Sequence, residues 1–369
     1  MILFLISFLA LAILTYGSYT LFIAKGLLRT QTNPDIDSLP DVAVVIAARN
    51  EEKNLPNILQ DLVNQNYDGK LNVYIADDRS TDSTWSLLDQ FSKKHPQVHP
   101  VRISALSNQM TPKKHALTQC LKQATAEIIL TTDADCRVGA GWVASAVSQM
   151  DEQTGILVGY VQVEAENIFA EYQALDYAGI VVSNAGMMNL GYAWSGSGGN
   201  LAYRRSAFTA IGGFNPVSHK VSGDDVYLVQ TIPQKTGLKA KFNTDPAHFV
   251  RTVAVSSLKE FLSQRVRWSS NSKGLERNDP MFFIFLVSAF LANILILIGG
   301  FIVFGEWSFW LFVGLKFIYE GIVLLLGARK FGYWSLLKLY PLWFILQPIY
   351  IPYVGLMGLR GKFIWKPQS

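Results

Sequence analysis

The sequence predicts an α/β fold: a mainly parallel β-sheet flanked by helices, with transmembrane helices at both ends of the chain. Two observations lead to this class. Between residues 41 and 130, short β-branched runs alternate with segments whose apolar residues recur at helical spacing, a pattern typical of a parallel sheet covered by helices. Long uncharged runs flank a stretch of about 250 residues of mixed composition, which is long enough for one large domain.

The composition favours a membrane protein. Of the 369 residues, 50% are hydrophobic and only 16% are charged, which is too apolar for an ordinary soluble enzyme. The net charge of +4 is modest, and no basic and aromatic array indicates a nucleic-acid partner. Lysines and arginines beside the apolar runs suit anionic membrane lipid. Cys120 and Cys136 lack metal-site spacing, so we expect both to be reduced and buried.

Four apolar runs predict membrane helices. The first carries no charge and exceeds the ~20 residues that span a bilayer core. Because it lacks a basic leading segment and a cleavage site, we expect an uncleaved anchor. The third contains Lys316 and Glu320, which can pair along one helix face inside a bundle. The four runs cover residues 2–24, 281–304, 307–328 and 339–359.

Basic residues beside these runs predict the orientation of the chain. Lys25 and Arg29 follow the first run and nothing positive precedes it, which places the central domain in the cytoplasm. The fourth run has basic residues on both sides and contains three prolines, so it either crosses the membrane or lies re-entrant or flat at its surface. We therefore expect a multi-pass inner-membrane protein with three or four crossings. Its parts are an anchor at 1–24, a cytoplasmic domain at 25–275 and a C-terminal membrane region at 276–369.

Each predicted strand of the central region ends in polar residues. Apolar residues at helical spacing follow the first two polar clusters, and Ser80, Thr81 or Asp82 can cap the second helix. A third helix is predicted from Lys113. The carboxyl ends of parallel strands meet at one edge of a sheet, so the polar clusters are expected to share one pocket. The predicted strands cover residues 41–48, 71–76, 98–103 and 127–130.

The fourth strand leads directly into Asp133 and Asp135. One residue separates them, so the end of the strand can aim both carboxylates at one pocket. Hard cations bind oxygen ligands of this kind, and a substrate phosphate can complete the coordination shell. An acidic turn after a buried strand would carry the same two residues, so the pair by itself leaves both interpretations open.

Six motifs in order resemble the family 2 glycosyltransferases, which are inverting enzymes of GT-A fold that use nucleotide-sugar donors. They cover about residues 40–270, a span long enough for one such domain. The last of them has the pattern Q-x-x-R-W, which resembles the membrane-embedded branch that includes cellulose, chitin, hyaluronan and poly-N-acetylglucosamine synthases. The motifs are Ala48-Arg-Asn-Glu-Glu52, Asp77–Asp82, Asp133-Ala-Asp135, Gly198–Ala202, Gly223-Asp-Asp225 and Gln264–Trp268.

The resemblance implies a UDP-sugar site beside the first three strands. Asp78 resembles the carboxylate that accepts a hydrogen bond from the base imide of a uridine nucleotide. Lys113 lies in a pattern like G-K-x-x-A-L, with Pro112 in place of the glycine, and would face the nucleotide end of the donor. A turn or helix-cap role for Asp78 and a solvated Lys113 are the plain alternatives. Further donor-binding residues implied by the first motif are Ala47, Ala48, Arg49 and Glu51.

The resemblance also implies a metal site and a general base. Asp135 would hold Mg²⁺ or Mn²⁺ against the donor diphosphate, and Asp133 would assist through ribose or a water. Asp225 would take the proton of the acceptor hydroxyl, opposite the leaving group. The glutamate that usually precedes this base is replaced by Asp224, which we assign a supporting role. Both aspartates would also be favourable at a helix N-terminus.

Two further motifs are expected to contact the donor or the acceptor. Gly198 and Gly199 permit close approach of the backbone to a sugar, although a plain turn would use them too. Gln264, Arg267 and Trp268 lie in a segment with an apolar face, which could lie at the membrane surface as an amphipathic helix. Arg267 offers a planar fork to the diphosphate and Trp268 a stacking surface for a sugar, while membrane-interface anchoring is the alternative for this pair.

The sequence thus predicts a membrane-bound, metal-assisted inverting glycosyltransferase. It would transfer a sugar from a UDP-sugar to a glycan or lipid acceptor with β-linkage, either processively or once, and the resemblance admits partner subunits of an export complex. Two alternatives come from other classes. A nucleotidyltransferase would need a glycine-rich phosphate loop after the first strand, which Ala47–Asn50 is not. A non-catalytic nucleotide-sugar-binding subunit of a polysaccharide synthesis complex would tolerate loss of the base, yet Asp225 is present.

Overall fold

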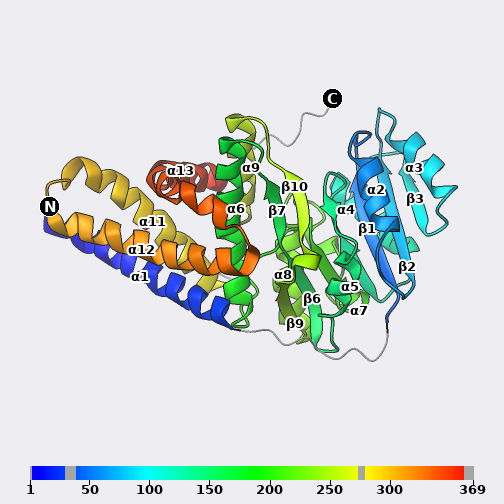
Figure 1. Cartoon of the computed structure of the whole chain (residues 1–369), viewed down its shortest axis with the longest axis horizontal. Helices are drawn as coiled ribbons and strands as arrows, with labels where there is room; N and C mark the ends of the chain where they lie inside the picture. Colours follow the sequence, from blue (N-terminus) through cyan, green and yellow to red (C-terminus); the bar gives the residue numbers. More distant parts are fainter. Residues whose placement is uncertain (1, 30–38, 273–278, 361–369) are drawn as a thin grey trace. The chain divides into compact units, whose positions relative to one another are not determined.

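The computed structural model describes residues 2–29, 39–272 and 279–360. It divides into two compact units (Figure 1). Unit 1 consists of Met1–Thr30, Ala165–Leu190 and Ala254–Ser369, and unit 2 of Gln31–Glu164 and Gly191–Val253. The segments 165–190 and 254–272, which fall inside the region expected to form the cytoplasmic domain, therefore belong to the same unit as the candidate membrane helices.

Unit 2 is built on a seven-stranded sheet of order β3-β2-β1-β4-β8-β6-β9, which confirms the predicted α/β class. Strands β3, β2, β1 and β4 are parallel neighbours, β8 is antiparallel to β4 and β6, and β9 is parallel to β6. The carboxyl ends of β1, β2 and β4 therefore share one edge, as predicted. The strands are β1 Val42–Ala48, β2 Leu71–Asp78, β3 Val98–Ile103, β4 Ile128–Thr131, β6 Thr154–Gly159, β8 Leu201–Arg204 and β9 Lys239–Asn243.

Strand β2 is longer than the sequence pattern indicated. It continues through Asp77 and Asp78, which pair in register with Arg102 and Ile103 of β3, so both aspartates lie within the strand rather than after it. The N-cap of the following helix α3, Thr84–Ser92, is Ser83, and not one of the three residues expected. Asp82 instead accepts hydrogen bonds from the backbone N–H groups of Glu52 and Thr84, which ties together the loops after β1 and β2.

The helices of unit 2 bury apolar faces against the sheet. In α2, Leu55–Val63, the buried side chains are Leu55, Ile58, Leu59 and Leu62, at the helical spacing that predicted this element. The other helices of the unit are α4 Pro112–Gln123, α5 Trp142–Val147, α7 Arg205–Ala210 and α8 Asp224–Thr236. A second, three-stranded sheet has the order β5-β10-β7, with β5 Arg137–Val138, β10 Val250–Val253 and β7 Val161–Glu164.

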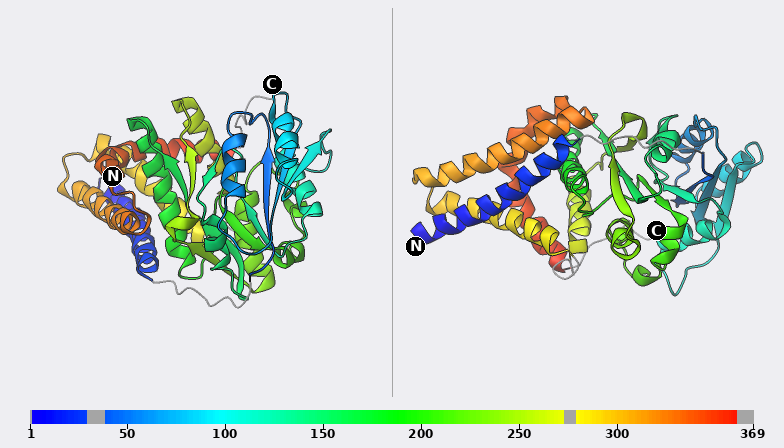
Figure 2. Two further views of the ribbon diagram at one scale, coloured as in Figure 1. Left: turned by 45° about the vertical axis from the view of Figure 1, so that its right-hand side comes forward. Right: turned by 90° about the horizontal axis from the view of Figure 1, so that it is seen from below.

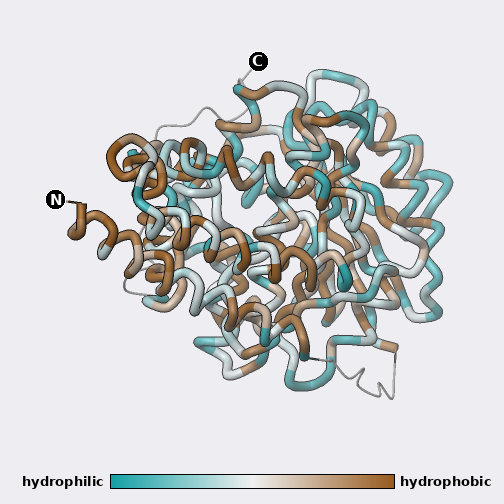
Figure 3. The backbone as a smooth tube through the Cα atoms, turned by 60° about the vertical axis from the view of Figure 1, so that its left-hand side comes forward, coloured by the Kyte–Doolittle hydropathy of each residue, from teal (hydrophilic) through white to brown (hydrophobic). Residues whose placement is uncertain are grey.

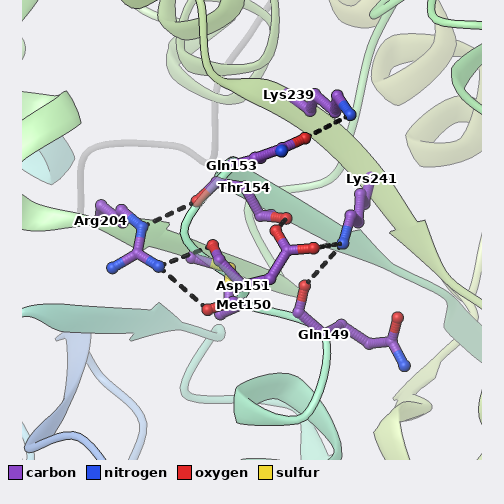
Figure 4. Close-up of polar contacts among 8 residues, drawn as sticks. All are labelled: Gln149, Met150, Asp151, Gln153, Thr154, Arg204, Lys239 and Lys241. Atoms are coloured by element: carbon purple, nitrogen blue, oxygen red, sulfur yellow. Dashed lines mark hydrogen bonds and ion pairs between the residues drawn. The ribbon is translucent and has the colours of Figure 1, made fainter. Parts of the chain in front are cut away.

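Basic side chains hold the loop that leads into β6 (Figure 4). Arg204 of β8 donates to the carbonyl oxygens of Met150, Asp151 and Thr154 at 2.7 to 3.0 Å. Lys241 of β9 lies 2.7 Å from a carboxylate oxygen of Asp151. Because three strands contribute to this network, it fixes the register of the half of the sheet that contains the antiparallel strand β8.

Among the described residues of unit 1, four helices are long and apolar enough to cross a membrane, by length and composition (Figure 1). The helices α1 Ile2–Leu28, α11 Pro280–Ile302 and α12 Trp307–Phe331 pack side by side, and apolar residues (brown) line α1 from the N-terminus (Figure 3). Their shared core includes Leu9, Ile13, Ala292 and Phe309. The fourth is α13 Tyr340–Arg360, which contains Pro348 and Pro352.

The pairing predicted for the third apolar run is present. Lys316 Nζ lies 2.8 Å from Glu320 Oε1 on α12, and both side chains are buried. Tyr16 of α1 donates to the same carboxylate oxygen, and Gln347 of α13 accepts from Lys316 at 2.7 Å. Each charge has a hydrogen-bonded partner, which is the condition for keeping an ion pair inside an apolar bundle.

Two further α-helices of unit 1 lie among the described residues. They are α6 Ile168–Met188 and α9 Leu258–Ser269, and α9 begins with a capping box made by Ser257 and Glu260. Asp176 of α6 joins α9 and α13, because it accepts from Arg265 at 2.7 Å, from Trp343 at 3.1 Å and from Tyr350 at 3.3 Å. Figure 2 presents these helices from two further directions.

Candidate active site

The candidate site of unit 2 lies at the carboxyl ends of β1, β2 and β4. Asp133 and Asp135 follow β4, as predicted, and Lys113 stands in the first turn of α4. Lys113 Nζ is 2.6 Å from Asp133 Oδ1, so the structure brings these two predicted residues into direct contact. Burial opposes the charge of Lys113, but Asp133, Asp224 and Asp225 outweigh it and raise its pKa. Lys113 is therefore paired with Asp133, although its side chain is still 35% exposed.

Asp225 lies in the first turn of α8, and its charge acts on Lys113. Its Oδ2 accepts the backbone N–H of Gly198 at 3.2 Å and its Oδ1 that of Val226 at 2.8 Å, so both oxygens have a fixed direction. Burial, and then the charge of Asp224, raises the pKa of Asp225 to about 6. This value is near neutrality, where a carboxylate can both accept and release a proton. The first-turn position predicted as an alternative also holds.

The loop Gly198–Gly199 separates the two acidic groups. A Cβ on Gly199 would lie 3.3 Å from Asp133 Oδ2, and one on Gly198 would lie 3.8 Å from Lys113 Nζ. Thr131 holds the loop through a hydrogen bond from its hydroxyl to the carbonyl oxygen of Gly198, at 3.2 Å. A side chain at Gly199 would press on the Asp133 carboxylate, whereas at Gly198 a Cβ would make only ordinary contacts. A pocket in this region is lined by Lys113, Thr131, Gly198, Asp224 and Asp225.

The sequence reasoning missed Lys114. This side chain is 1% exposed, and its ammonium lies 2.6 Å from the carbonyl oxygen of Lys220 and 3.7 Å from Asp224 Oδ1. Burial lowers the pKa of Lys114, although Asp224 and Asp225 favour its charge. Asp224 is thus paired with a buried cation beside the candidate base, while its supporting role stays a prediction. In the sequence Lys114 simply follows Lys113, and no spacing distinguishes it from a solvated lysine.

The side chains at the predicted metal position fit a divalent cation. Asp133, Asp135 and Cys136 each offer a ligand atom, and these atoms lie within 4.8 Å of one another. Burial raises the pKa of Cys136, and the two aspartates raise it further, so the thiol stays protonated. The donor set is therefore two carboxylates, which suits a hard cation whose shell a diphosphate completes. Cys120 is buried as well, as expected.

The residues predicted for the nucleoside lie at the ends of β1 and β2. Asp78 is buried, and its two oxygens accept hydrogen bonds from Arg79 at 2.8 and 3.0 Å. Glu51 stands in the loop after β1, where its N–H donates to the hydroxyl of Thr84 and its carboxylate accepts from Asn54. Ala47 and Ala48 belong to β1 itself, and Arg49 follows them directly. The structure places these residues, while their contacts with a nucleoside stay a prediction.

The Q-x-x-R-W residues Gln264, Arg267 and Trp268 lie on α9 of unit 1. The apolar face of this helix is partly occupied inside that unit, because Phe261 and Val266 are buried. The guanidinium of Arg265 lies 4.3 Å from the centre of the Trp268 ring, and Trp268 also contacts Tyr177. One face of the tryptophan is therefore covered within unit 1, and its predicted stacking on a sugar would use the rest of the ring.

The sheet and its acidic edge define a class of protein. A mainly parallel sheet that carries paired aspartates at its carboxyl edge is the architecture of GT-A glycosyltransferases. The family model described as glycosyl transferase family 2 matches residues 43–212, and that of glycosyl transferase family group 2 matches residues 128–355. The chain belongs to the family 2 glycosyltransferases and is an enzyme of that class.

Relatives of the chain are named for different glycosyltransferase activities. The chain is 30% identical over 185 residues to a beta-monoglucosyldiacylglycerol synthase of Nostoc sp. (strain PCC 7120 / SAG 25.82 / UTEX 2576), covering 48% of this chain and 38% of the relative. It is 24% identical over 251 residues to an N-acetylglucosaminyltransferase of Rhizobium meliloti (strain 1021), covering 63% and 56% respectively. The matched region thus spans less than two thirds of the length of these curated relatives.

A solved structure shares the fold over nearly the whole chain. It is a mannosyltransferase from Pyrobaculum calidifontis in complex with GDP-Man and Mn²⁺, with a TM-score of 0.62 and 22% sequence identity. The match covers 97% of this chain and 99% of that one. At this identity the likeness establishes the common fold.

Proposed function

We propose that the chain transfers a sugar from a UDP-sugar to a glycan or lipid acceptor with inversion at the anomeric carbon. One observation carries this proposal: Asp225 is fixed by two backbone N–H groups beside Lys113, which in turn contacts Asp133. Displacement of a nucleoside diphosphate requires a base for the acceptor hydroxyl and positive charge beside the leaving group. A carboxylate of raised pKa can act as the base, and a cation next to an acidic metal position can supply the charge.

The proposed reaction assigns a task to each side chain. Asp225 removes the proton of the acceptor hydroxyl while that oxygen forms a bond to the anomeric carbon. The bond to the diphosphate breaks on the opposite face, and its electron pair leaves with the nucleotide. Lys113 stabilises the negative charge that develops there. A divalent cation held by Asp135 and Asp133 would supply further neutralisation of the leaving group, and the Mn²⁺ of the mannosyltransferase structure supports this assignment.

The choice of a uridine nucleotide rests on Asp78. Its carboxylate is an acceptor of fixed direction at the end of β2, and such a group can select a base that presents an imide N–H. Arg79, which donates both hydrogen bonds to Asp78, would have to share this carboxylate with the base. The mannosyltransferase of similar fold was solved with GDP-Man, so a comparison of guanosine and uridine donors tests the assignment of a uridine nucleotide.

Two acceptor classes remain within this function. The relative named for diacylglycerol supports a single transfer to a lipid, whereas the Q-x-x-R-W pattern on α9 supports the polymer-forming branch. We favour a lipid or lipid-linked acceptor, because the stronger of the two matches is to the lipid enzyme. An extended polymer among the products would instead support the synthase branch, and with it the partner subunits of an export complex.

We further propose that α1, α11 and α12 cross the membrane and that α13 lies within its cytoplasmic boundary. Both ends of α13 touch helices that are not candidate spans. Lys338, just before α13, bonds to Glu171 of α6, and Gly358, near its end, packs directly against Ser269 of α9. In Figure 1, α13 is viewed nearly along its axis, whereas α1, α11 and α12 extend across the view. This arrangement keeps the basic residues on both sides of α13 in the cytoplasm.

Fusions of a fluorescent protein that matures only in the cytoplasm test this topology. Fusions after residue 332 and after residue 369 should both fluoresce in intact cells, and a fusion in the loop before Trp307 should not. A dark C-terminal fusion beside a fluorescent one at residue 332 would mean that α13 crosses the bilayer.

A panel of radiolabelled donors tests the activity. Membranes containing the chain are incubated with UDP-glucose, UDP-N-acetylglucosamine, other UDP-sugars and GDP-mannose, and the label is followed into lipid and polymer fractions. We expect incorporation from one UDP-sugar, and its loss in Asp225→Asn and in Asp135→Ala. The matched control is Asp89→Asn on α3, whose carboxylate makes an exposed pair with Lys93. Incorporation that survives both site variants would disprove the assignment.

A further inference from the structure

Two adjacent lysines at the start of α4 serve different carboxylates. Lys113 points to Asp133 at the metal position, with its ammonium 2.6 Å from Oδ1. Lys114 points to the segment that leads into α8, where it contacts the carbonyl oxygen of Lys220 and lies 3.7 Å from Asp224. Successive helical residues are 100° apart around the axis, so one turn of helix can reach both halves of the site.

The first turn of α4 holds the segment before α8 at three points. The backbone N–H of Thr111 donates to the carbonyl oxygen of Ser218 at 2.9 Å. The hydroxyl of Thr111 and the ammonium of Lys114 both donate to the carbonyl oxygen of Lys220, at 3.3 and 2.6 Å. Lys220 lies only a few residues before Asp224 and Asp225, so these bonds restrict where the candidate base can stand.

The burial of Lys114 is unfavourable by itself. Its side chain is 1% exposed, and a buried ammonium loses its hydration, which a carbonyl oxygen and one carboxylate at 3.7 Å replace only in part. Burial lowers the pKa of this lysine, so the folded chain holds the charge at a cost in stability. An apolar side chain of similar length would fill the same volume without that cost. The charge of Lys114 therefore serves its interaction with the acidic pair, Asp224 and Asp225, rather than the stability of the core.

We propose that Lys114 is a positioning residue for the general base: it clamps the segment 218–220 onto α4 and places a buried positive charge beside Asp224, the neighbour of Asp225. The catalytic part of this inference rests on the proposed function, whereas the clamp does not. It differs from the role of Lys113, which faces the donor. Lys114 acts through Asp224 and the backbone of Lys220.

The effect on pH dependence follows from the charges around Asp225. Asp224 lies on α8 with Asp225, and Lys113 and Lys114 lie on α4. Asp133 contacts Lys113. Backbone N–H groups of Gly198 and Val226 donate to Asp225. Removing the charge of Lys114 leaves the acidic pair with one neighbouring cation. Asp225 then holds its proton more tightly, so the pH at which the base becomes active should rise.

Lys114→Met and Lys114→Arg test the catalytic part, with Lys122→Met, an exposed lysine of the same helix, as control. In Lys114→Met we expect kcat to fall about tenfold with little change in donor KM, and the acid limb of the kcat/KM profile to rise by about 0.5 to 1 pH unit. Lys114→Arg should retain the wild-type limb. A Lys114→Met enzyme with unchanged kcat and profile would overturn the proposal, as would a loss of stability without any shift of the limb.

Amide hydrogen exchange tests the clamp independently of activity. Lys114→Met should exchange faster than wild type over residues 218–226, and Lys122→Met should not. If Lys114→Met fails to fold, Thr111→Val removes one bond to the carbonyl oxygen of Lys220 and should raise exchange in the same segment without moving the acid limb. Unchanged exchange would overturn the clamp. Retained activity in Asp225→Asn would refute the proposed base. The hydrogen-exchange result would still test the clamp independently.

Discussion

The ammonium of Lys113 lies 2.6 Å from Asp133 Oδ1, and the charges of Asp224 and Asp225 also raise the pKa of this lysine. One cation therefore connects the metal position after β4 with the candidate base at the start of α8. This connection explains how residues that are distant in the sequence form one site. The charge of Lys113 also opposes the rise in the pKa of Asp225 that burial and Asp224 cause.

The activity should require the ionised form of Asp225. Burial and Asp224 raise the pKa of this carboxyl to about 6, and a general base works only when deprotonated. We expect kcat/KM to rise with pH and to level off above about pH 7, with a half-maximal value near pH 6. A profile measured with membranes and the accepted donor checks this. An acid limb near pH 4 would show that Asp225 is not the titrating group.

Asp225→Asn should lose activity and gain stability at the same time. The pKa of Asp225 in the folded chain is raised above the ordinary aspartate value of 3.8, so ionisation destabilises the fold. This penalty is absent below about pH 4 and complete above about pH 6. We expect incorporation to fall about 100-fold or more. The free energy of unfolding should rise by about 1 kcal/mol at pH 8, after allowance for partial exposure and a lost hydrogen bond.

Thermal unfolding in detergent at pH 8 and pH 4 measures the stability effect. The gain should be present at pH 8 and absent at pH 4. An equal change at both pH values would point to altered packing instead of a removed charge.

Removing divalent cations should abolish transfer. The ligand set of Asp133 and Asp135 is made of oxygen atoms and, with a diphosphate, suits Mg²⁺ or Mn²⁺. We expect EDTA to stop incorporation and added Mn²⁺ or Mg²⁺ to restore it. Asp135→Ala should raise the metal concentration needed for half-maximal rate, and the control Asp89→Asn should not. Full activity in EDTA would contradict a metal-assisted mechanism.

The contact between Asp176 and Arg265 should be essential to unit 1. Both side chains are about 95% buried, and Trp343 and Tyr350 also donate to the carboxylate. Removing only the arginine leaves a buried charge without its cation, so Arg265→Met should lower stability by roughly 3 kcal/mol. The double variant Asp176→Leu with Arg265→Met should be less destabilised than the single one. Thermal unfolding of the three proteins in detergent measures this, and additive losses would contradict the account.

The sequence could predict those site residues that lie at the ends of strands. The polar clusters after β1, β2 and β4 could be assigned to one edge because parallel strands share it, and the structure has these strands in that order. Lys114 could not be found in this way, because its role arises from a contact with the carbonyl oxygen of Lys220 far along the chain. Contacts of this kind leave no periodic pattern in the sequence.

The division into units was also beyond the sequence. Helix α6 has no long uncharged run that would assign it to unit 1 with the candidate membrane helices, and its link to α9 depends on the pairing of Asp176 with Arg265. The prolines of α13 indicated an irregular segment, but only its contacts with Glu171, through Lys338, and with Ser269 give its direction. Tertiary contacts decided both features.

The stereochemistry of the product tests the central claim most directly. A nucleotide sugar with an α-linked diphosphate is given to the enzyme together with the acceptor class found in the donor panel, and the anomeric configuration of the product is determined by NMR. Attack by an acceptor hydroxyl that Asp225 has deprotonated predicts a β-linked product. An α-linked product would contradict the inverting mechanism and the role assigned to Asp225.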